Sequence, residues 1–304
     1  MKVDPAQYQR RSVVVDEVAV SYVSAGAGRP VVLIHGNPGS FHDYTLAVVE
    51  RLSQSYHVFA FDRPGHGYSG RHDSVQTTVE VQARIVRDAL QKLGIVQPVL
   101  VGHSWGGSLV LAAAVAYGND LSGIVLLAPA AYPSVRVEWW SLVPHVPLIG
   151  RFVVNRLTPT LGRSLVRRSL RQAYEPQDVQ HEYAEAAAEL WMQPDHIRAC
   201  AYDERTLRAS LKRLSQSYSE IKLPAVIVTG SDDRLIDPKE HAYPLQQAIE
   251  NSRLIVLPET GHQLPQTQPD AVVSAVDLVW STIKKPRVNA DDADQSALSA
   301  PSAA

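Results

Sequence analysis

Six short runs of almost unbroken Val, Ile, Leu and Ala constrain the fold of this chain more than any other feature of its sequence. They are Val31–His35, Val58–Asp62, Val99–Gly102, Ile124–Ala128, Ala225–Gly230 and Leu254–Leu257. Strands that are buried on both faces of a parallel sheet have this composition. Earlier in the chain, Val13–Val15 and Val18–Ser24 are expected to form an opening antiparallel pair.

Segments with apolar residues at helical spacing separate these strands. They are Leu46–Leu52, Val79–Leu93, Ser108–Tyr117, Glu240–Ile249 and Ala271–Ile283. This alternation predicts βαβ units and an α/β fold, in which a mostly parallel sheet is flanked by helices. Active sites in such sheets lie on the loops at the carboxyl ends of the strands.

The alternation stops after Ala128 and resumes at Ala225. The intervening segment shows helical patterns at Val137–Leu142, Leu148–Leu157, Gly162–Tyr174, Gln177–Trp191 and Ile197–Leu214. We therefore expect a core formed by residues 1–131 and 223–285, with residues 132–222 inserted as a helical cap over the strand ends. Residues 286–304 are rich in Ala, Ser and Asp, and this tail is expected to be disordered.

The composition argues against several classes of protein. The formal net charge of the 304 residues is −2, so the chain has no general attraction for nucleic acid. No apolar run approaches the ~18–20 residues that span a bilayer, and the N-terminus lacks the apolar segment of a secretory signal. Cys200 is the single cysteine, which excludes an internal disulfide and fits a reducing compartment. These features predict a cytoplasmic location.

The sequence GHSWGG, residues 102–107, lies between an apolar strand and a helix. A G-x-S-x-G pattern in this context is typical of a nucleophile on a sharp turn, where glycines allow a strained backbone and close contacts. A structural turn rich in glycine is the alternative interpretation. The strand before it and the helix after it favour Ser104 as a nucleophile.

A serine hydroxyl needs a base that accepts its proton. His262 follows the last predicted strand, so its position along the chain fits this role. The loop after Gly230 offers Asp232, Asp233 and Asp237 as the acid that orients the base. Asp233 is favoured because it lies three residues after Gly230, whereas the other two are explained as turn or capping residues.

An oxyanion formed during acyl transfer needs two hydrogen-bond donors. The backbone N–H of Trp105, next to Ser104, is one candidate. The other is the backbone N–H of Asn37 in the loop HGNPGS, because Pro38 has no N–H. In the segment DRPGHGYS, Asp62 and His66 are interpreted as structural residues of a tight turn, and so is His103 beside the nucleophile.

Four blocks, HGNPGS, DRPGHGYS, GHSWGG and the pair GSDD…GH, resemble the α/β-hydrolase superfamily over about residues 11–285. The resemblance implies an eight-stranded sheet, a catalytic triad and a mobile cap. The loop HGNP also resembles haloalkane dehalogenases and epoxide hydrolases, but these enzymes carry an aspartate nucleophile where this chain has Ser104. GHSWGG resembles proline iminopeptidases, whose oxyanion loop reads HGGPG instead of HGNPG.

The cap carries seven arginines between Arg136 and Arg171, together with Trp, Leu, Ile and Phe residues. We interpret the arginines as facing solvent; a surface for anionic lipid, or for an acyl substrate with a charged head, is the alternative. Apolar residues in the cap favour a substrate with a hydrophobic acyl part. The sequence has no HExxH or CxxC pattern, so neither a metal nor a cofactor is expected.

The leading hypothesis is a serine hydrolase that cleaves a carboxylic ester of a small molecule through a Ser104 acyl-enzyme. The same triad would serve C–C bond hydrolysis, amide hydrolysis or a perhydrolase, also called a cofactor-free haloperoxidase. A small-molecule receptor or signalling protein on the same fold is the alternative from another class. The oligomeric state stays open.

Overall fold

The computed structural model describes residues 8–71, 78–135 and 158–283, and seven single positions between residues 135 and 158. Its centre is an eight-stranded sheet with the strand order β1-β2-β4-β3-β5-β6-β7-β8. Strand β2 runs antiparallel to both of its neighbours, and all other neighbouring strands are parallel. The predicted mostly parallel sheet is therefore confirmed. The strands are β1 Arg11–Val15, β2 Val18–Ala25, β3 Pro30–Ile34, β4 His57–Phe61, β5 Val99–His103, β6 Gly123–Leu127, β7 Ala225–Gly230 and β8 Ser252–Leu257.

The central strands are apolar throughout because both faces of the sheet are covered. Successive side chains of a strand point to opposite faces. In β5, Leu100 joins the core on one face, whereas Val99 and Val101 join the core on the other. Helices α3 Val79–Lys92, α4 Trp105–Tyr117 and α9 Ala242–Ala248 cover the first face, and α2 Val48–Leu52 and α11 Pro269–Thr282 cover the second.

The helix expected at Leu46–Leu52 is present as α2 and begins two residues later, at Val48, and a separate short helix, α1 His42–Thr45, precedes it. The two helices are separated at Ala47, whose φ of −148° lies outside the helical range. Tyr44 of α1 is fully buried, and its hydroxyl donates to the Ile34 carbonyl over 2.9 Å. This bond anchors the short helix to the end of β3.

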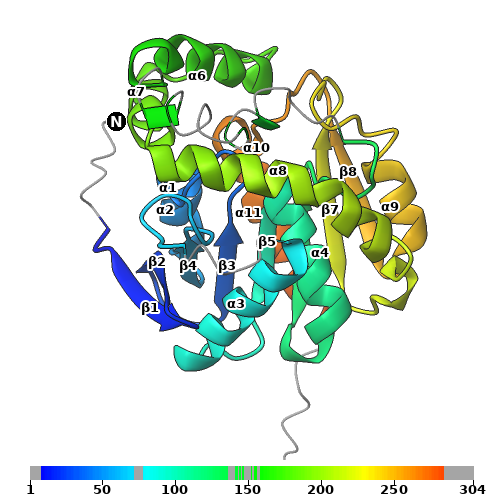
Figure 1. Ribbon diagram of the computed structural model, residues 1–304. Coiled ribbons are helices and arrows are strands. Elements are labelled where there is room, and N and C mark those ends of the chain that lie inside the picture. Colours follow the sequence, from blue (N-terminus) through cyan, green and yellow to red (C-terminus); the bar gives the residue numbers. More distant parts are fainter. Residues whose placement is uncertain are drawn as a thin grey trace, which may run out of the picture.

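Three long helices lie between β6 and β7: α6 Thr158–Tyr174, α7 His181–Trp191 and α8 Pro194–Leu214. They stand on the side of the sheet to which the carboxyl ends of the parallel strands point (Figure 1). The expected helices Val137–Leu142 and Leu148–Leu157 lie almost wholly outside the described residues, as does the tail 286–304. Shorter helices are η2 Gly118–Asp120, η5 Tyr218–Glu220 and α10 Leu264–Thr267. Within the described part of the chain, no helix combines the length and apolar character needed to cross a membrane.

Candidate active site

Ser104 occupies a strained turn between β5 and α4. Its φ is +53° and its ψ is −117°, a backbone conformation that residues with a side chain rarely adopt. Two glycines make the turn sterically feasible. A Cβ atom on Gly102 would lie 2.3 Å from the Gly106 carbonyl oxygen, and one on Gly106 would lie 2.4 Å from the Ile34 carbonyl oxygen. The turn leaves Ser104 half-buried at the carboxyl end of the sheet.

Asp233 and His262 form a buried pair on the loops after β7 and β8. The Nδ1 atom of His262 lies 2.7 Å from Oδ2 of Asp233. The other oxygen of Asp233 accepts hydrogen bonds of 2.9 Å from the backbone N–H groups of Leu235 and Ile236. With the carboxylate held as an acceptor, the imidazole proton resides on Nδ1, and Nε2 is left as the basic nitrogen.

The two other candidate acids of the loop have different partners. Asp232 accepts a hydrogen bond of 2.8 Å from the hydroxyl of Ser231. Asp237 accepts one of 2.9 Å from the backbone N–H of Lys239. Neither carboxylate contacts the His262 ring, so the geometry singles out Asp233.

His103, next to Ser104, joins the nucleophile turn to the loop that carries His262. His103 donates from Nε2 to the His262 carbonyl over 2.9 Å, and the two rings lie 4.8 Å apart. Burial lowers the pKa of His103 to about 3, so this imidazole is neutral and its role is structural. Among the described residues, the Ser104 hydroxyl makes no hydrogen bond to His262, and such contacts often tighten only when substrate is bound.

The predicted oxyanion donors lie on two segments that adjoin Ser104. Trp105 is the first residue of α4, and the loop with Asn37 follows β3. A Cβ atom on Gly36 would lie 3.2 Å from Cβ of Ser104, so this loop packs directly against the nucleophile. Within the described residues, the backbone N–H groups of Asn37 and Trp105 have no hydrogen-bond acceptor. Both groups therefore fit the predicted role of oxyanion donor.

The turn after β4 holds a buried cation that the sequence analysis did not single out. Asp62 accepts hydrogen bonds from the backbone N–H groups of Phe41 and Tyr68, over 2.7 and 2.8 Å, as expected for a structural residue. Its neighbour Arg63 is fully buried and pairs with Asp203 of α8. A charged residue in a glycine-rich surface turn normally faces solvent, so the sequence contained no signal for this burial.

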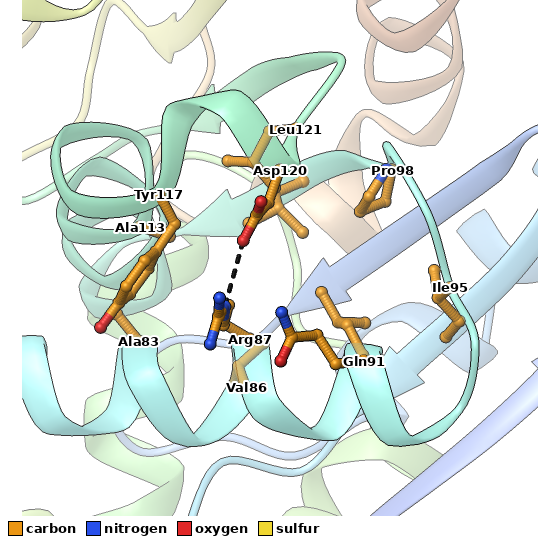
Figure 2. A pocket seen from close by; sticks show the side chains of 12 residues that line it. Ala83, Val86, Arg87, Gln91, Ile95, Pro98, Ala113, Tyr117, Asp120 and Leu121 are labelled. Carbon is orange, nitrogen blue, oxygen red and sulfur yellow. Dashed lines mark hydrogen bonds and ion pairs between the residues drawn. The ribbon is translucent and has the colours of Figure 1, made fainter.

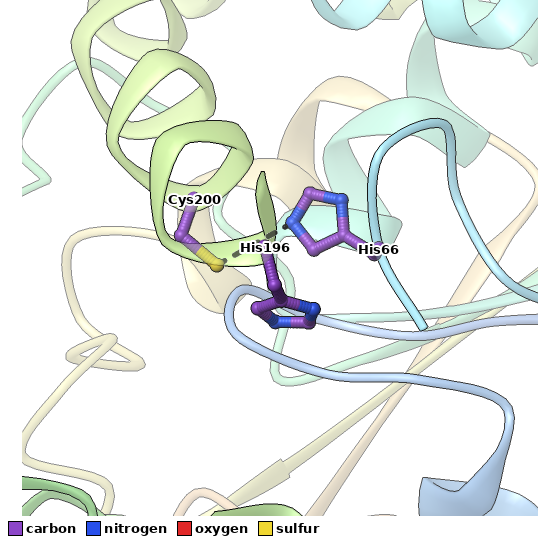
Figure 3. Close-up of side chains that lie close together, drawn as sticks. All are labelled: His66, His196 and Cys200. Carbon is purple, nitrogen blue, oxygen red and sulfur yellow. Dashed lines mark hydrogen bonds between the residues drawn. The ribbon is translucent and has the colours of Figure 1, made fainter. Parts of the chain in front are cut away.

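His66, His196 and Cys200 gather beside this turn, and their candidate ligand atoms lie within 4.8 Å of one another (Figure 3). Three features argue against a metal ion there. The Arg63 guanidinium lies 3.2 Å from Nε2 of His66, where its charge would repel a cation. Burial raises the pKa of the Cys200 thiol, whereas metal binding requires the thiolate. Nδ1 of His196 already accepts a hydrogen bond of 3.4 Å from the backbone N–H of Gly67.

A small cavity between α3 and α4 is unconnected with these residues (Figure 2). Pro98 and Leu121 in its wall precede β5 and β6, so the cavity lies at the amino ends of these strands, opposite Ser104. An ion pair of 3.1 Å between Arg87 and Asp120 crosses it. Its volume of about 30 Å³ is sufficient for roughly one water molecule.

Helix α7 contacts the core through a buried carboxyl group. The hydroxyl of Tyr183 donates to Oδ1 of Asp43 over 2.8 Å. Burial raises the pKa of Asp43 to about 7, although the hydrogen bond from Tyr183 opposes this shift. Between pH 4 and pH 7 the unfolded chain has released this proton while the folded chain still holds it, so stability falls as the pH rises.

Asp43→Asn abolishes this titration. We expect the free energy of unfolding of the variant, relative to that of the unaltered protein, to rise by up to about 4 kcal/mol between pH 4 and pH 7 and then to level off. Urea unfolding at pH 4, 5, 6, 7 and 8 measures the difference. Asp195→Asn, at an exposed carboxylate, is the control and should show no trend. A pH-independent difference for Asp43→Asn would contradict the assignment.

Comparisons with known proteins agree with the fold. The family described as "alpha/beta hydrolase fold" matches residues 29–265, and the chain belongs to this family. A 2-hydroxy-6-oxo-2,4-heptadienoate hydrolase of Pseudomonas putida is 28% identical over 83% of this chain and 89% of that protein. A haloalkane dehalogenase of Mycobacterium tuberculosis is 26% identical over 84% and 90%. An α/β-hydrolase fold protein of Burkholderia ambifaria superimposes with a TM-score of 0.77, at 24% identity, over 88% of this chain and 96% of that one. The protein is thus a member of the α/β-hydrolase family.

Proposed function

We propose that the protein is a serine hydrolase that cleaves a carboxylic ester with an apolar acyl part, with Ser104, His262 and Asp233 as its catalytic triad. The observation that carries this proposal is the buried hydrogen bond of 2.7 Å between His262 and Asp233, next to a nucleophile turn in which Ser104 has a φ of +53°. Serine with a base suits acyl transfer, whereas the alkyl ester intermediate of dehalogenases needs a carboxylate nucleophile.

In the proposed mechanism, the Ser104 hydroxyl attacks the ester carbonyl while Nε2 of His262 accepts its proton. Asp233 holds the ring and stabilises the imidazolium. The backbone N–H groups of Asn37 and Trp105 bind the oxyanion of the tetrahedral intermediate. His262 then protonates the leaving alcohol, and the same groups activate water to hydrolyse the acyl-enzyme.

We further propose that residues 132–222 form the cap of this site. The backbone N–H groups of His262 and Gln263 both donate to the Ala173 carbonyl at the end of α6, over 3.0 Å. The side-chain amide of Asn37 donates to the Cys200 carbonyl of α8 over 3.1 Å. These bonds tie the inserted helices to the loops that carry the base and an oxyanion donor. The single cysteine, Cys200, is buried and fits the cytoplasmic location that belongs to the same proposal.

An apolar acyl group is favoured by the side chains of the insert. Leu142, Val146 and Phe152 are apolar and exposed, by 53%, 43% and 62%. Such side chains recognise methylene groups, each of which contributes about 0.8 kcal/mol on burial. Of the arginines in this stretch, the described Arg167, Arg168 and Arg171 are exposed, which fits a solvent-facing role.

A panel of p-nitrophenyl esters from acetate to decanoate tests this proposal. We expect kcat/KM to rise about fourfold for each methylene added to the acyl chain, and to stop rising once the chain is longer than the acyl-binding pocket that we propose. Labelling by a fluorophosphonate, followed by mass spectrometry, should modify Ser104. A labelled protein that hydrolyses none of these esters would overturn the ester assignment.

C–C bond hydrolysis is the second candidate, because the relative from Pseudomonas putida is a 2-hydroxy-6-oxo-2,4-heptadienoate hydrolase at 28% identity. Loss of the dienoate absorbance on incubation with such a compound would support this candidate over the ester. Perhydrolase activity would appear only with added peroxide. A receptor would bind its ligand without ester hydrolysis, C–C bond hydrolysis or perhydrolase activity.

A further inference from the structure

Arg63 bonds to the loop that carries the predicted oxyanion donor. Its Nη2 donates to the Gly36 carbonyl over 2.8 Å, and its Nε donates to the His35 carbonyl over 3.2 Å. The backbone N–H of Arg63 donates to Nε2 of His35 over 2.9 Å, which leaves the proton of that ring on Nδ1. Nδ1 of His35 therefore donates to the Gly36 carbonyl as well, over 2.8 Å.

The Gly36 carbonyl and the Asn37 N–H are the two ends of one peptide group. Donors on the carbonyl oxygen polarise the group and make its N–H a stronger donor, and the effect is larger in a buried site. One of these two donors is a guanidinium without exposed surface, so its charge is little screened. Arg63 also lies 4.0 Å above the ring of Trp105, the residue that supplies the other predicted oxyanion donor.

A carboxylate of the inserted helices, that of Asp203, neutralises the charge of Arg63. Oδ2 of Asp203 in α8 lies 2.5 Å from Nη1 of Arg63. Oδ1 of Asp203 accepts from Gln82 over 3.0 Å and from Arg71 over 2.8 Å. Both members of the Arg63–Asp203 pair are fully buried, and a buried charge is retained only when it is paired and hydrogen-bonded.

We propose that Arg63 is a positioning residue of the oxyanion hole, which orients and polarises the Gly36–Asn37 peptide and supports Trp105, and that Asp203 of the insert holds it in place. This inference rests on the proposed function. It assigns to the turn after β4 a role in stabilising the transition state, in addition to its role in the fold.

The test compares a double variant, Arg63→Gln with Asp203→Asn, with Arg71→Gln. The double variant removes both charges of the fully buried pair together, so it should fold. Arg71, whose side chain is 14% exposed, keeps an amide oxygen as acceptor at position 203. Arg71→Gln removes another cation from Asp203 and does not contact Gly36, so it is the matched control. Thermal unfolding of each variant checks that it is folded.

For the double variant, we expect kcat on the preferred ester to fall about 10- to 100-fold with KM changed less than about threefold, since losing a whole oxyanion donor costs about 10²- to 10³-fold. The inhibition constant of a trifluoromethyl ketone, which forms the oxyanion at Ser104, should rise in the same proportion. Arg71→Gln should alter both values less than about threefold. A folded double variant with an unchanged inhibition constant, or a control with the same loss, would overturn the inference.

A readout independent of turnover separates this inference from the proposed function. In protein labelled with ¹⁵N-asparagine, the Asn37 amide proton should shift upfield in the double variant, because the peptide is less polarised, and should stay in place in Arg71→Gln. If the unaltered protein hydrolyses no ester, the proposed function fails, and this shift still decides whether Arg63 acts on the peptide. An unmoved Asn37 resonance would refute the polarisation.

Discussion

Ser104→Ala should lower kcat/KM for a p-nitrophenyl ester by about 10⁵- to 10⁶-fold. The loss is this large because no other group can form the acyl-enzyme, and the remaining oxyanion donors act only on an unassisted attack by water. The fold should be unaffected, since alanine and serine have similar difficulty with the positive φ at this position. Steady-state kinetics with the preferred ester measures the effect.

Ser108→Ala is the matched control for this substitution. Ser108 lies on α4, the helix that follows Ser104, and its hydroxyl donates to the Ala130 carbonyl over 2.5 Å. Its loss should alter kcat/KM less than about tenfold, at a cost to stability of about 1–3 kcal/mol for the unpaired buried carbonyl. Fluorophosphonate labelling of a serine other than Ser104, or residual activity of Ser104→Ala above about 1%, would exclude Ser104 as the nucleophile.

Asp233→Asn is expected to reduce kcat by about 10³- to 10⁴-fold. The amide would donate to Nδ1 of His262, which places the imidazole proton on Nε2 and leaves no base facing Ser104. The amide oxygen can still accept from the backbone N–H groups of Leu235 and Ile236, so the loop should keep its conformation.

Asp232→Asn separates this effect from a general change of charge in the loop. Asp232 is exposed, and its carboxylate bonds only to the neighbouring Ser231 hydroxyl among the described residues, so its substitution should alter kcat less than about threefold. Steady-state assays of both variants at pH 8 give the comparison. Equal losses would mean that the carboxylates act through their summed charge and that Asp233 does not orient His262.

Among the contacts between the insert and the core in the described residues, two buried side-chain pairs lead to the loop after β3. Asp203 of α8 pairs with Arg63, which bonds to the oxyanion loop. Tyr183 of α7 donates to Asp43 of α1, in the segment that follows the same loop. Under the proposed function, a movement of the insert would therefore alter the environment of the oxyanion donors as well as access to Ser104.

The sequence by itself determined the sheet and the positions of Ser104 and His262, because these depend on local requirements. Strands that are buried on both faces must be apolar along their length, as Val99–Val101 is. A positive φ at Ser104 and the close approach of neighbouring backbone admit only glycine at Gly102 and Gly106. Such requirements act over a few neighbouring residues and can be recognised without the rest of the chain.

Only the tertiary structure showed which of the three aspartates contacts His262 and revealed the burial of Arg63. Asp232, Asp233 and Asp237 have the same chemistry, and the path of the loop alone directs Asp233 toward His262. Arg63 has the appearance of a solvent-facing residue in its turn, and its burial depends on Asp203, which follows 140 residues later in the chain. A buried charge is stable only when its partner is present, so its position depends on a contact between distant segments that no local pattern encodes.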